Sequence, residues 1–463
     1  MLMTLSLPND NKTFLNDVND YAVRFVDLFA GMGGLRKGFE IACENIGLIS
    51  SCVFTSEIKS HAIDILQQNY PNEKVHGDIT EICEKSVPDF DFLLAGFPCQ
   101  AFSSAGKRLG FLDTRGTLFF DIERILKEKQ PFGFILENVE GLVNHDKINK
   151  NDKIGRTLSI ILGSLNNLGY KVTWHILDAK NFGVPQERKR IYILGTKRTL
   201  PKIYNFESKK IILNDILESG LPHEDSRFID LLLSKYSPEE LYGRAVKDKR
   251  GGENNIHSWD IELKGSVSSE QRKLLNMMLR ERRKRKWAID YEIDWMDGMP
   301  LTIEHIKTFF DNENLENMLE DLVEKKYLTL EYPKRKEGNK RVQDKTLPLG
   351  YNIVAGKMSF EVSKILDPNG FAPTLVAMDM ERLYVVDRGG LRKLSLREGL
   401  RLFGYPDSYK FNIERKLGYD LLGNTVVVPP VTAVAKQVLN IYKEEFYHED
   451  VAQRYIQFID SRR

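Results

Sequence analysis

The chain has 463 residues, of which 42% are hydrophobic and 29% are charged, and its formal net charge is +1. This length predicts two or three domains, and the composition excludes a disordered or fibrous protein. No apolar stretch approaches the length of a membrane span, and the first residues lack the basic start and apolar core of a signal peptide. We therefore expect a cytoplasmic protein with no membrane partner.

From residue 23 to about residue 197, short apolar runs alternate with amphipathic segments of helical length. This alternation indicates β-α units and a parallel sheet. The predicted strands span residues 23–29, 50–58, 89–96, 132–139, 171–179 and 190–197. The predicted helices lie between them, at residues 33–47, 59–69, 117–129 and 155–168.

The pattern changes after about residue 200, where the charge density rises and the alternation stops. Near residue 386 a regular pattern returns. It predicts a helix with a glycine stop and then a long amphipathic helix, which we expect to dock on the first domain. We therefore divide the chain into an N-terminal extension (1–20), a first domain (21–200), an insertion (201–385) and a returning segment (386–463) that completes the first domain.

Within the insertion, residues 300–356 predict helix, helix, strand, basic turn and strand. This is the order of a winged helix-turn-helix, a fold that often contacts DNA. A helical subdomain that only packs against its neighbours fits the same pattern. Two basic runs, RERRKRKW at 280–287 and PKRKEGNKR at 333–341, are either solvated faces or a patch for a polyanion.

A glycine-rich stretch, VDLFAGMGGLRKGF, joins the first predicted strand to the first predicted helix. Glycines there let the backbone approach a ligand closely, and the helix N-terminus offers unpaired amides. Glu57 and Asp78 follow at the ends of the next strands, where a carboxylate binds ribose hydroxyls in doubly wound folds, so the sequence favours an adenosine site. Asp27, inside the stretch, either faces a cationic ligand or caps the following turn, and we favour the cap.

The sequence holds four cysteines, too few and too irregularly spaced for a disulfide framework or a zinc site, so we expect reduced thiols and no metal. One of them, Cys99, follows the third predicted strand in a loop that Pro98 stiffens. Loops at the carboxyl ends of parallel strands line the active crevice of such sheets, so this thiol is presented where it can react. A thiol that only packs is the alternative.

Three charged residues are expected near that thiol. Glu137 ends the next predicted strand and should face the same crevice. No histidine base accompanies the thiol, which disfavours a thiol protease. Arg188 and Arg190 enter a later strand on one side, where a guanidinium would favour the thiolate or hold a carbonyl or phosphate. Ordinary edge charges are the alternative for the arginines.

Seven blocks, in this order, resemble the cytosine-C5 DNA methyltransferases: DLFAGMGG, GFPCQAFS, DTRGTLFFDI, ENVEG, QERKR, RLFGYPD and GNTVVVPP. The resemblance runs from residue 23 to about 197 and from about 371 to 440, which is more than half of the chain. Pro430, the second proline of the last block, departs from the family pattern, and we expect it to leave the chemistry unaffected. The resemblance implies a Rossmann-like α/β methyltransferase sheet with helices on both faces and a smaller inserted α+β target recognition domain.

In this family the glycine loop binds S-adenosylmethionine. The residues that match the cofactor pocket are Phe29, Gly31, Gly33, Glu57, Asp78, Pro98, Leu118 and Asn424. Cys99 matches the nucleophile that adds to C6 of a cytosine swung out of the duplex. Glu137 matches the acid at the amino edge and ring nitrogen of that base. Arg190 matches the residue that holds the carbonyl oxygen, and Arg188 supports the same pocket.

The resemblance further implies a sequence-specific enzyme that acts as a monomer on double-stranded DNA, in a bacterial restriction-modification system with a cognate endonuclease. The basic runs of the insertion then contact phosphates. An RNA (tRNA) cytosine-C5 methyltransferase is disfavoured by the large basic insertion. A non-catalytic DNA-binding relative is disfavoured by the intact Cys99, Glu137 and Arg190. A nicotinamide-dependent oxidoreductase is disfavoured by the glycine spacing.

Overall fold

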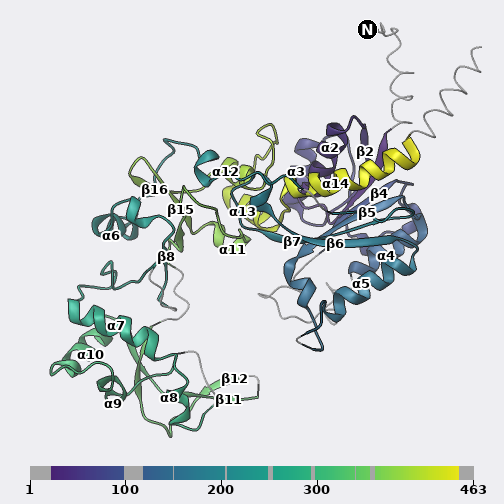
Figure 1. Ribbon diagram of the computed structural model, residues 1–463. Helices are drawn as coiled ribbons and strands as arrows, with labels where there is room; N and C mark the ends of the chain where they lie inside the picture. Colours follow the sequence, from purple (N-terminus) through teal and green to yellow (C-terminus); the bar gives the residue numbers. More distant parts are fainter. Residues whose placement is uncertain are drawn as a thin grey trace, which may run out of the picture. The chain divides into compact units, whose positions relative to one another are not determined.

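The computed structural model describes residues 22–97, 118–149, 151–203, 206–248, 254–293, 298–338, 340–354 and 360–447. The chain divides into two compact units, whose elements are labelled in Figure 1. The first unit comprises Met1–Leu217, Phe371–Met380 and Ser395–Arg463, and the second comprises Glu218–Gly370 and Glu381–Leu394. None of the helices in the described part of the chain combines the length and apolar character needed to cross a bilayer.

The first unit is built on a seven-stranded sheet in the order β3-β2-β1-β4-β5-β7-β6. Its strands are β1 (Val23–Leu28), β2 (Ser50–Ser56), β3 (Val75–His76), β4 (Phe92–Gly96), β5 (Gly133–Val139), β6 (Lys171–Asp178) and β7 (Lys189–Thr196). All six predicted strands are confirmed. The central strands β1, β4 and β5 are almost continuously buried, as expected of strands that are covered on both faces.

The predicted parallel sheet is confirmed for five strands, and one edge departs from it. Strands β1 to β5 run parallel, whereas β7 is antiparallel to both of its neighbours, β5 and β6. The cause is the short connection of residues 179–188 between β6 and β7. A parallel pair needs a crossover of about a dozen residues or more, so the chain turns back as a hairpin instead.

Helices cover both faces of this sheet (Figure 1). Helices α2 (Gly34–Asn45) and α14 (Val428–Tyr442) lie on one face, and α4 (Leu118–Lys129) and α5 (Arg156–Asn167) lie on the other. With α3 (Ser60–Asn69), they confirm the four predicted helices and the docking of the closing helix. Close approach of α14 to α2 requires Gly38, because a Cβ there would lie 2.5 Å from Val431 Cγ1.

The first unit also contains α11 (Ala377–Met380), α12 (Leu396–Leu402) and α13 (Arg415–Asn424). A capping box starts α12: the Glu398 amide donates to Ser395 Oγ, and the Ser395 amide donates to the Glu398 carboxylate. The helix ends before Gly404, whose φ of 73° confirms the predicted glycine stop.

Residues 371–380 belong to the first unit, although we assigned them to the insertion from the sequence. They pair with the chain that leads into β7: the Ala372 amide donates to the Pro185 carbonyl (2.8 Å), and the Glu187 amide donates to the Ala372 carbonyl (2.9 Å). Residues 381–394 return to the second unit as two strands. The chain therefore crosses between the units four times.

The second unit has two hydrophobic cores. One core forms around α6 (Arg227–Lys235) and a five-stranded sheet in the order β16-β15-β14-β8-β9. The strands are β8 (Ala245–Val246), β9 (Asn255–Ile256), β14 (Lys364–Ile365), β15 (Leu383–Asp387) and β16 (Gly390–Lys393). Buried Asp387 accepts the amide of Gly220 (2.9 Å) and pairs with Arg392 (2.7 Å), which ties the two ends of the unit together.

The other core lies among four helices and strands β10 (Leu328–Glu331) and β13 (Gly350–Ile353), and an exposed hairpin extends from it. The helices are α7 (Ser269–Glu281), α8 (Lys286–Ile289), α9 (Ile303–Lys307) and α10 (Leu315–Glu324). Strand β10 pairs with β13, and β11 (Lys334–Glu337) pairs with β12 (Lys340–Gln343), both antiparallel. The elements follow the predicted order of helix, helix, strand, basic turn and strand.

Candidate active site

A cavity of about 920 Å³ opens within the first unit. Its size falls in the range of cofactor and substrate pockets in proteins. A large part of its wall comes from the carboxyl ends of strands β1, β2, β4 and β5, the edge at which α/β sheets bind ligands. Of the sequence-predicted site residues that the structure describes, it is lined by Phe29, Gly31, Glu57, Asp78, Leu118, Glu137, Arg188, Arg190 and Asn424.

The glycine loop forms one wall of the cavity. The backbone of Phe29 (φ 55°), Gly31 (φ 54°) and Gly33 (φ 76°) is left-handed, so the loop folds back on itself between β1 and α2. A Cβ on Gly31 would meet no atom within 4 Å, so this residue leaves open space on the cavity side. Gly34 is needed for packing, because a Cβ there would lie 2.7 Å from the Tyr405 hydroxyl oxygen.

The two predicted carboxylates stand next to this loop. Glu57 is buried, and its Oε2 accepts the Gly31 amide (2.6 Å), while its Oε1 accepts the amides of Ile58 and Lys59 (2.8 Å each). Asp78 is exposed, and its Oδ1 accepts the amide (2.9 Å) and the hydroxyl (2.8 Å) of Thr80. Glu57 thus fixes the loop, and both side chains face the same cavity.

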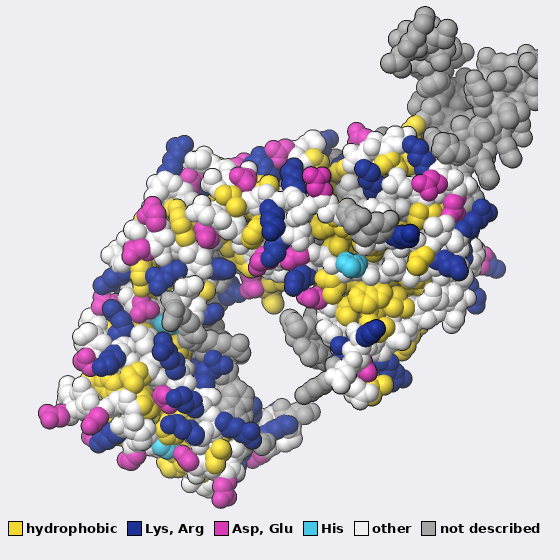
Figure 2. Space-filling model, in the orientation of Figure 1, with side chains coloured by type: hydrophobic (Ala, Val, Ile, Leu, Met, Phe, Trp, Pro, Cys, Tyr) yellow, Lys and Arg dark blue, Asp and Glu magenta, His cyan; other side chains and the backbone are white. Residues whose placement is uncertain are grey.

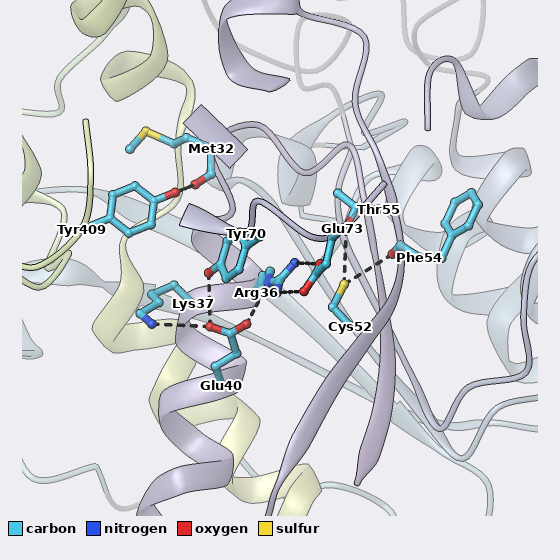
Figure 3. A network of polar contacts seen from close by, with 10 residues as sticks. All are labelled: Met32, Arg36, Lys37, Glu40, Cys52, Phe54, Thr55, Tyr70, Glu73 and Tyr409. Atoms are coloured by element: carbon cyan, nitrogen blue, oxygen red, sulfur yellow. Dashed lines mark hydrogen bonds and ion pairs between the residues drawn. The ribbon is translucent and has the colours of Figure 1, made fainter. Parts of the chain in front are cut away.

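A buried polar network fastens helix α2, which carries the loop (Figure 3). The Arg36 guanidinium donates to both carboxylate oxygens of Glu73 and to Glu40 Oε1 (2.7 Å), and it lies 3.2 Å from the centre of the Tyr70 ring. From the returning segment, the Tyr409 hydroxyl donates to the backbone carbonyl of Met32 inside the loop (Figure 3). The network therefore connects the loop to residues far away in the sequence.

Asp27 lies beneath the loop, on β1, with an exposed fraction of 0%. Neither of its carboxylate oxygens meets strict hydrogen-bond geometry with a described residue, although the Arg36 backbone amide in the first turn of α2 lies close enough to lower its pKa. The role as a cap therefore stays a prediction. The cap position of α2 is occupied by Gly33. Burial raises the pKa of Asp27 to about 8, although the positive charge of Arg36 opposes the shift and the negative charge of Glu57 adds to it. The raised pKa favours the protonated form of Asp27 at pH 7.

Glu137 and Arg190 form an ion pair deeper in the cavity. Glu137 is buried on β5, and its Oε1 lies 3.1 Å from Arg190 Nε, on the neighbouring strand β7. Burial raises the pKa of Glu137, and the charges of Arg190 and Arg188 oppose that shift. The pair places a buried carboxyl group, which can carry a proton, beside a positively charged guanidinium. This arrangement suits a ring with adjacent hydrogen-bond donor and acceptor atoms.

Arg188 points elsewhere than Arg190. It is buried, and its guanidinium donates to three backbone carbonyls, those of Leu375 (2.7 Å), Thr425 (2.9 Å) and Gly423 (3.3 Å). These carbonyls belong to the segments 371–380 and 415–425 that close the cavity. Arg188 therefore positions the cavity wall.

The predicted nucleophile Cys99 and its neighbour Pro98 lie outside the described residues. The chain that leads to them is held by Asn138, whose Nδ2 donates to the Phe97 carbonyl (3.1 Å) while its Oδ1 accepts the Val139 amide (2.8 Å). In the sheet, Gly96 at the end of β4 pairs with Glu137 on β5. The segment that carries Cys99 thus starts beside Glu137.

Several lining residues were not predicted. Ile58 follows Glu57 and is 70% exposed, although it is apolar. Its position directly after a strand-end carboxylate is the signal that sequence reasoning could have used. Thr374 and Val376 come from the segment that we had assigned to the insertion, and no local pattern marks them.

The described cysteines do not line the cavity, and burial raises the pKa of Cys43 and of Cys52 to about 12. Cys83 is exposed. Within the described ranges no group of three or more histidine, cysteine, aspartate or glutamate side chains could hold a metal ion.

Comparisons with known proteins agree with this geometry. A family model described as C-5 cytosine-specific DNA methylase matches residues 23–440. The chain is 61% identical, over 90% of its length and 99% of the relative, to the Type II methyltransferase M.NlaIV of Neisseria lactamica. It is 41% identical to the Type II methyltransferase M.HgiCI of Herpetosiphon aurantiacus, over 91% of its length and 98% of the relative. A methyltransferase structure from Entamoeba histolytica, EhMeth, has the same fold, with a TM-score of 0.50 and 14% identity over 91% of this chain and 99% of that one.

Proposed function

The chain belongs to the C-5 cytosine-specific DNA methylase family, and from this membership we propose how its residues divide the work of methylating cytosine. It is a DNA (cytosine-5-)-methyltransferase of Rossmann-like α/β fold, and base flipping with a covalent adduct is the mechanism of its family. The observation that carries the proposal is the single cavity into which both the glycine loop and the Glu137–Arg190 pair open.

We propose that S-adenosylmethionine occupies the glycine-loop side of the cavity. The residues that would hold it are Phe29, Gly31, Gly33, Glu57, Asp78, Pro98, Leu118 and Asn424. Gly31 leaves open space where a side chain would intrude, and Asp78 keeps its second carboxylate oxygen for a ligand hydroxyl or amino group. Ile58 adds an exposed apolar surface next to Glu57. When bound, this cofactor supplies an electrophilic methyl group on a sulfonium.

The remaining chemistry is assigned to the other side of the cavity. The thiolate of Cys99 adds to C6 of cytosine, which makes C5 electron-rich enough to accept the methyl group. Glu137, whose pKa is raised by burial, can share a proton with N3 of the ring and so stabilise the charge that develops there. Arg190 stabilises electron density at O2. Loss of the C5 proton then lets the Cys99 sulfur leave.

The substrate is DNA, and we propose that it is a duplex from which one cytosine is swung out. C6 is shielded within a stacked duplex, so the base must be extruded at a cost of a few kcal/mol. The names of the relatives as Type II methyltransferases support a role in a restriction-modification system, with a cognate endonuclease acting on the same site. We further propose that the enzyme is a cytoplasmic monomer and that the second unit recognises the target sequence.

The test is covalent trapping. Methylated plasmid is first sequenced with bisulfite to find the modified cytosine, and a duplex is then made with 5-fluorocytosine at that position. With S-adenosylmethionine present, we expect a stable protein–DNA adduct that peptide mapping assigns to Cys99, because fluorine blocks the loss of the C5 proton.

Cys99→Ser should form no adduct and transfer no methyl group. Cys83→Ser is the matched control, because Cys83 is an exposed thiol outside the cavity, and it should behave as wild type. Methylation by Cys99→Ser at the wild-type rate, or an adduct on another residue, would contradict the assignment.

A further inference from the structure

The second core of the second unit has the connectivity of a winged helix. Helix α7 is followed by the short helix α8, by an extended segment at Leu301, by helices α9 and α10, by β10, by the hairpin β11–β12 and by β13, so α8 is an addition to the winged-helix order. The sheet is completed in the winged-helix manner, because β13 pairs with β10 on one side and Tyr351 bridges Leu301 on the other. Leu274, Leu319 and Ile353 lie in one core, so this module has its own interior.

The helix that would read DNA in such a fold is unsuited to it here. In a helix-turn-helix the second helix of the pair enters the major groove, and in this module that helix is α10. Its solvent-facing side chains include Glu316, Glu320 and Glu324, all exposed, and half-buried Asp321. A negative face repels phosphates, so α10 is not the surface that approaches a duplex.

The hairpin β11–β12, the wing, has the opposite character. All four residues of β12 are exposed, and so are Arg335 to Glu337 of β11. Figure 2 shows lysine and arginine side chains gathered over the part of the second unit that carries α8 and this hairpin. Lys336 and Arg341 stand directly opposite each other across the two strands. Two like charges in that position destabilise a hairpin, so this pair lowers the stability of the wing.

Acidic residues near the wing do not neutralise that pair. Asp344 is bound to Arg335, which also donates to the carbonyls of Tyr291 and Glu292 (3.3 Å each) and so anchors the base of the hairpin. Glu331 accepts from Lys334 (2.9 Å). Among the described residues, Lys336 and Arg341 form no ion pair, and two cations facing one way are left to bind something else.

The other basic run of the module contributes less than its sequence suggests. Arg282 is buried and donates to Asn352 Oδ1 (2.7 Å), so it supports the core. Lys284 pairs with Glu281, and Lys286 lies 3.9 Å from the centre of the Trp287 ring. Three of the six cations of 280–287 are therefore engaged within the protein, while Arg280 and Arg285 are exposed.

We propose that this module binds duplex DNA through its wing, with Lys336 and Arg341 on the phosphates, and that α10 faces away from the DNA. The inference rests on the proposed function, since it takes duplex DNA as the substrate. Backbone contacts of this kind carry no sequence information, so the wing adds affinity and orientation while base recognition lies elsewhere.

The experiment compares the full-length wild type with Lys336→Gln/Arg341→Gln in DNA binding at several salt concentrations. Loss of two phosphate contacts should lower the slope of log affinity against log salt by about 2 and weaken binding roughly 10-fold or more at 0.1 M salt. The loss should be equal on duplexes with and without the target sequence. The single-turnover rate at saturating DNA should stay as in wild type, and the melting temperature should be equal or higher because the like-charge pair is gone.

Two further variants make the result specific. Lys307→Gln/Lys326→Gln removes the same charge from exposed positions on the same module and should leave the slope unchanged. Glu316→Gln/Glu320→Gln removes charge from α10 and should also leave it unchanged. A wing variant that binds DNA as wild type does would overturn the proposal and assign the wing to an acidic protein partner. A steep gain in affinity from the α10 variant would overturn it as well. Failure of the wild type to methylate DNA would instead count against the proposed function.

Discussion

Asp27→Asn isolates the buried carboxyl group that lies on β1 beneath the glycine loop. Asn has nearly the same shape but no charge, so the substitution removes the titration and keeps the volume. The folded protein holds Asp27 with a pKa raised from 3.8 to about 8, mainly by burial. In the unfolded chain the carboxyl is exposed and ionises near its ordinary pKa.

The sign of the effect follows from that difference. Between pH 4 and pH 8 the unfolded chain is ionised at this position and the folded protein is protonated, so folding takes up a proton. Stability is therefore lost steadily as the pH rises through this window, and the loss levels off above pH 8. At pH 7 the loss of folding free energy caused by Asp27 is at most about 3 pKa units, which corresponds to roughly 4 kcal/mol. The Arg36 charge is already contained in the pKa of about 8. Relaxation of the site reduces the remaining value, so we expect Asp27→Asn to gain about 1 to 4 kcal/mol at pH 7.

Urea unfolding at pH values from 5 to 9 measures this gain. The advantage of Asp27→Asn over wild type should grow with pH and reach a plateau near pH 8. Asp89→Asn serves as the control, because the Asp89 side chain is 81% exposed and its removal should not change the shape of the pH dependence. Parallel curves for wild type and Asp27→Asn, or a variant that becomes less stable at high pH, would refute the reasoning.

Two other substitutions test how the site is held. Tyr409→Phe removes the hydroxyl that donates to the Met32 carbonyl, so we expect a loss of about 1 kcal/mol in unfolding free energy and weaker S-adenosylmethionine binding by calorimetry. Unchanged cofactor affinity would mean that the loop does not need this bond. Asn138→Ala frees the Phe97 carbonyl just before the nucleophile, so the single-turnover rate should fall roughly 10-fold or more while cofactor affinity stays near wild type. An equal fall in both quantities would point to misfolding rather than to mispositioning of Cys99.

Much of the fold could be predicted because its signals are local. Continuous apolar runs marked the central strands, amphipathic segments marked the helices, and Gly404 marked the end of α12. The direction of β7 was missed because it depends on the length of the connection before it, not on any residue within the strand. The domain boundary at 385 placed 371–380 in the insertion, although the resemblance resumes at about residue 371, because backbone pairing with Pro185 and Glu187 leaves no trace in side-chain composition.

The candidate site divides in the same way. Residues at strand ends were predictable, since parallel topology brings Glu57, Asp78 and Glu137 to one edge of the sheet. Arg188 and Arg190 read alike in the sequence, two residues apart beside one strand, yet one donates to backbone carbonyls and the other pairs with a carboxylate. Both arginines line the cavity, but segments that arrive from far along the chain decide which of them pairs with Glu137, so spacing alone could not separate their roles.

That dependence on distant segments also explains why the returning segment must complete the first unit. The floor of the glycine loop is packed by Tyr405 and Thr425, whose hydroxyls bond to each other (2.7 Å) directly against Gly34. Tyr409 then holds the loop from the same side. The loop between strand β1 and helix α2 is therefore held in its folded shape by residues about 370 positions later in the sequence. The entropy cost of closing a loop grows only slowly with the number of residues in it. The second unit can therefore be inserted at little cost in free energy once these buried contacts form.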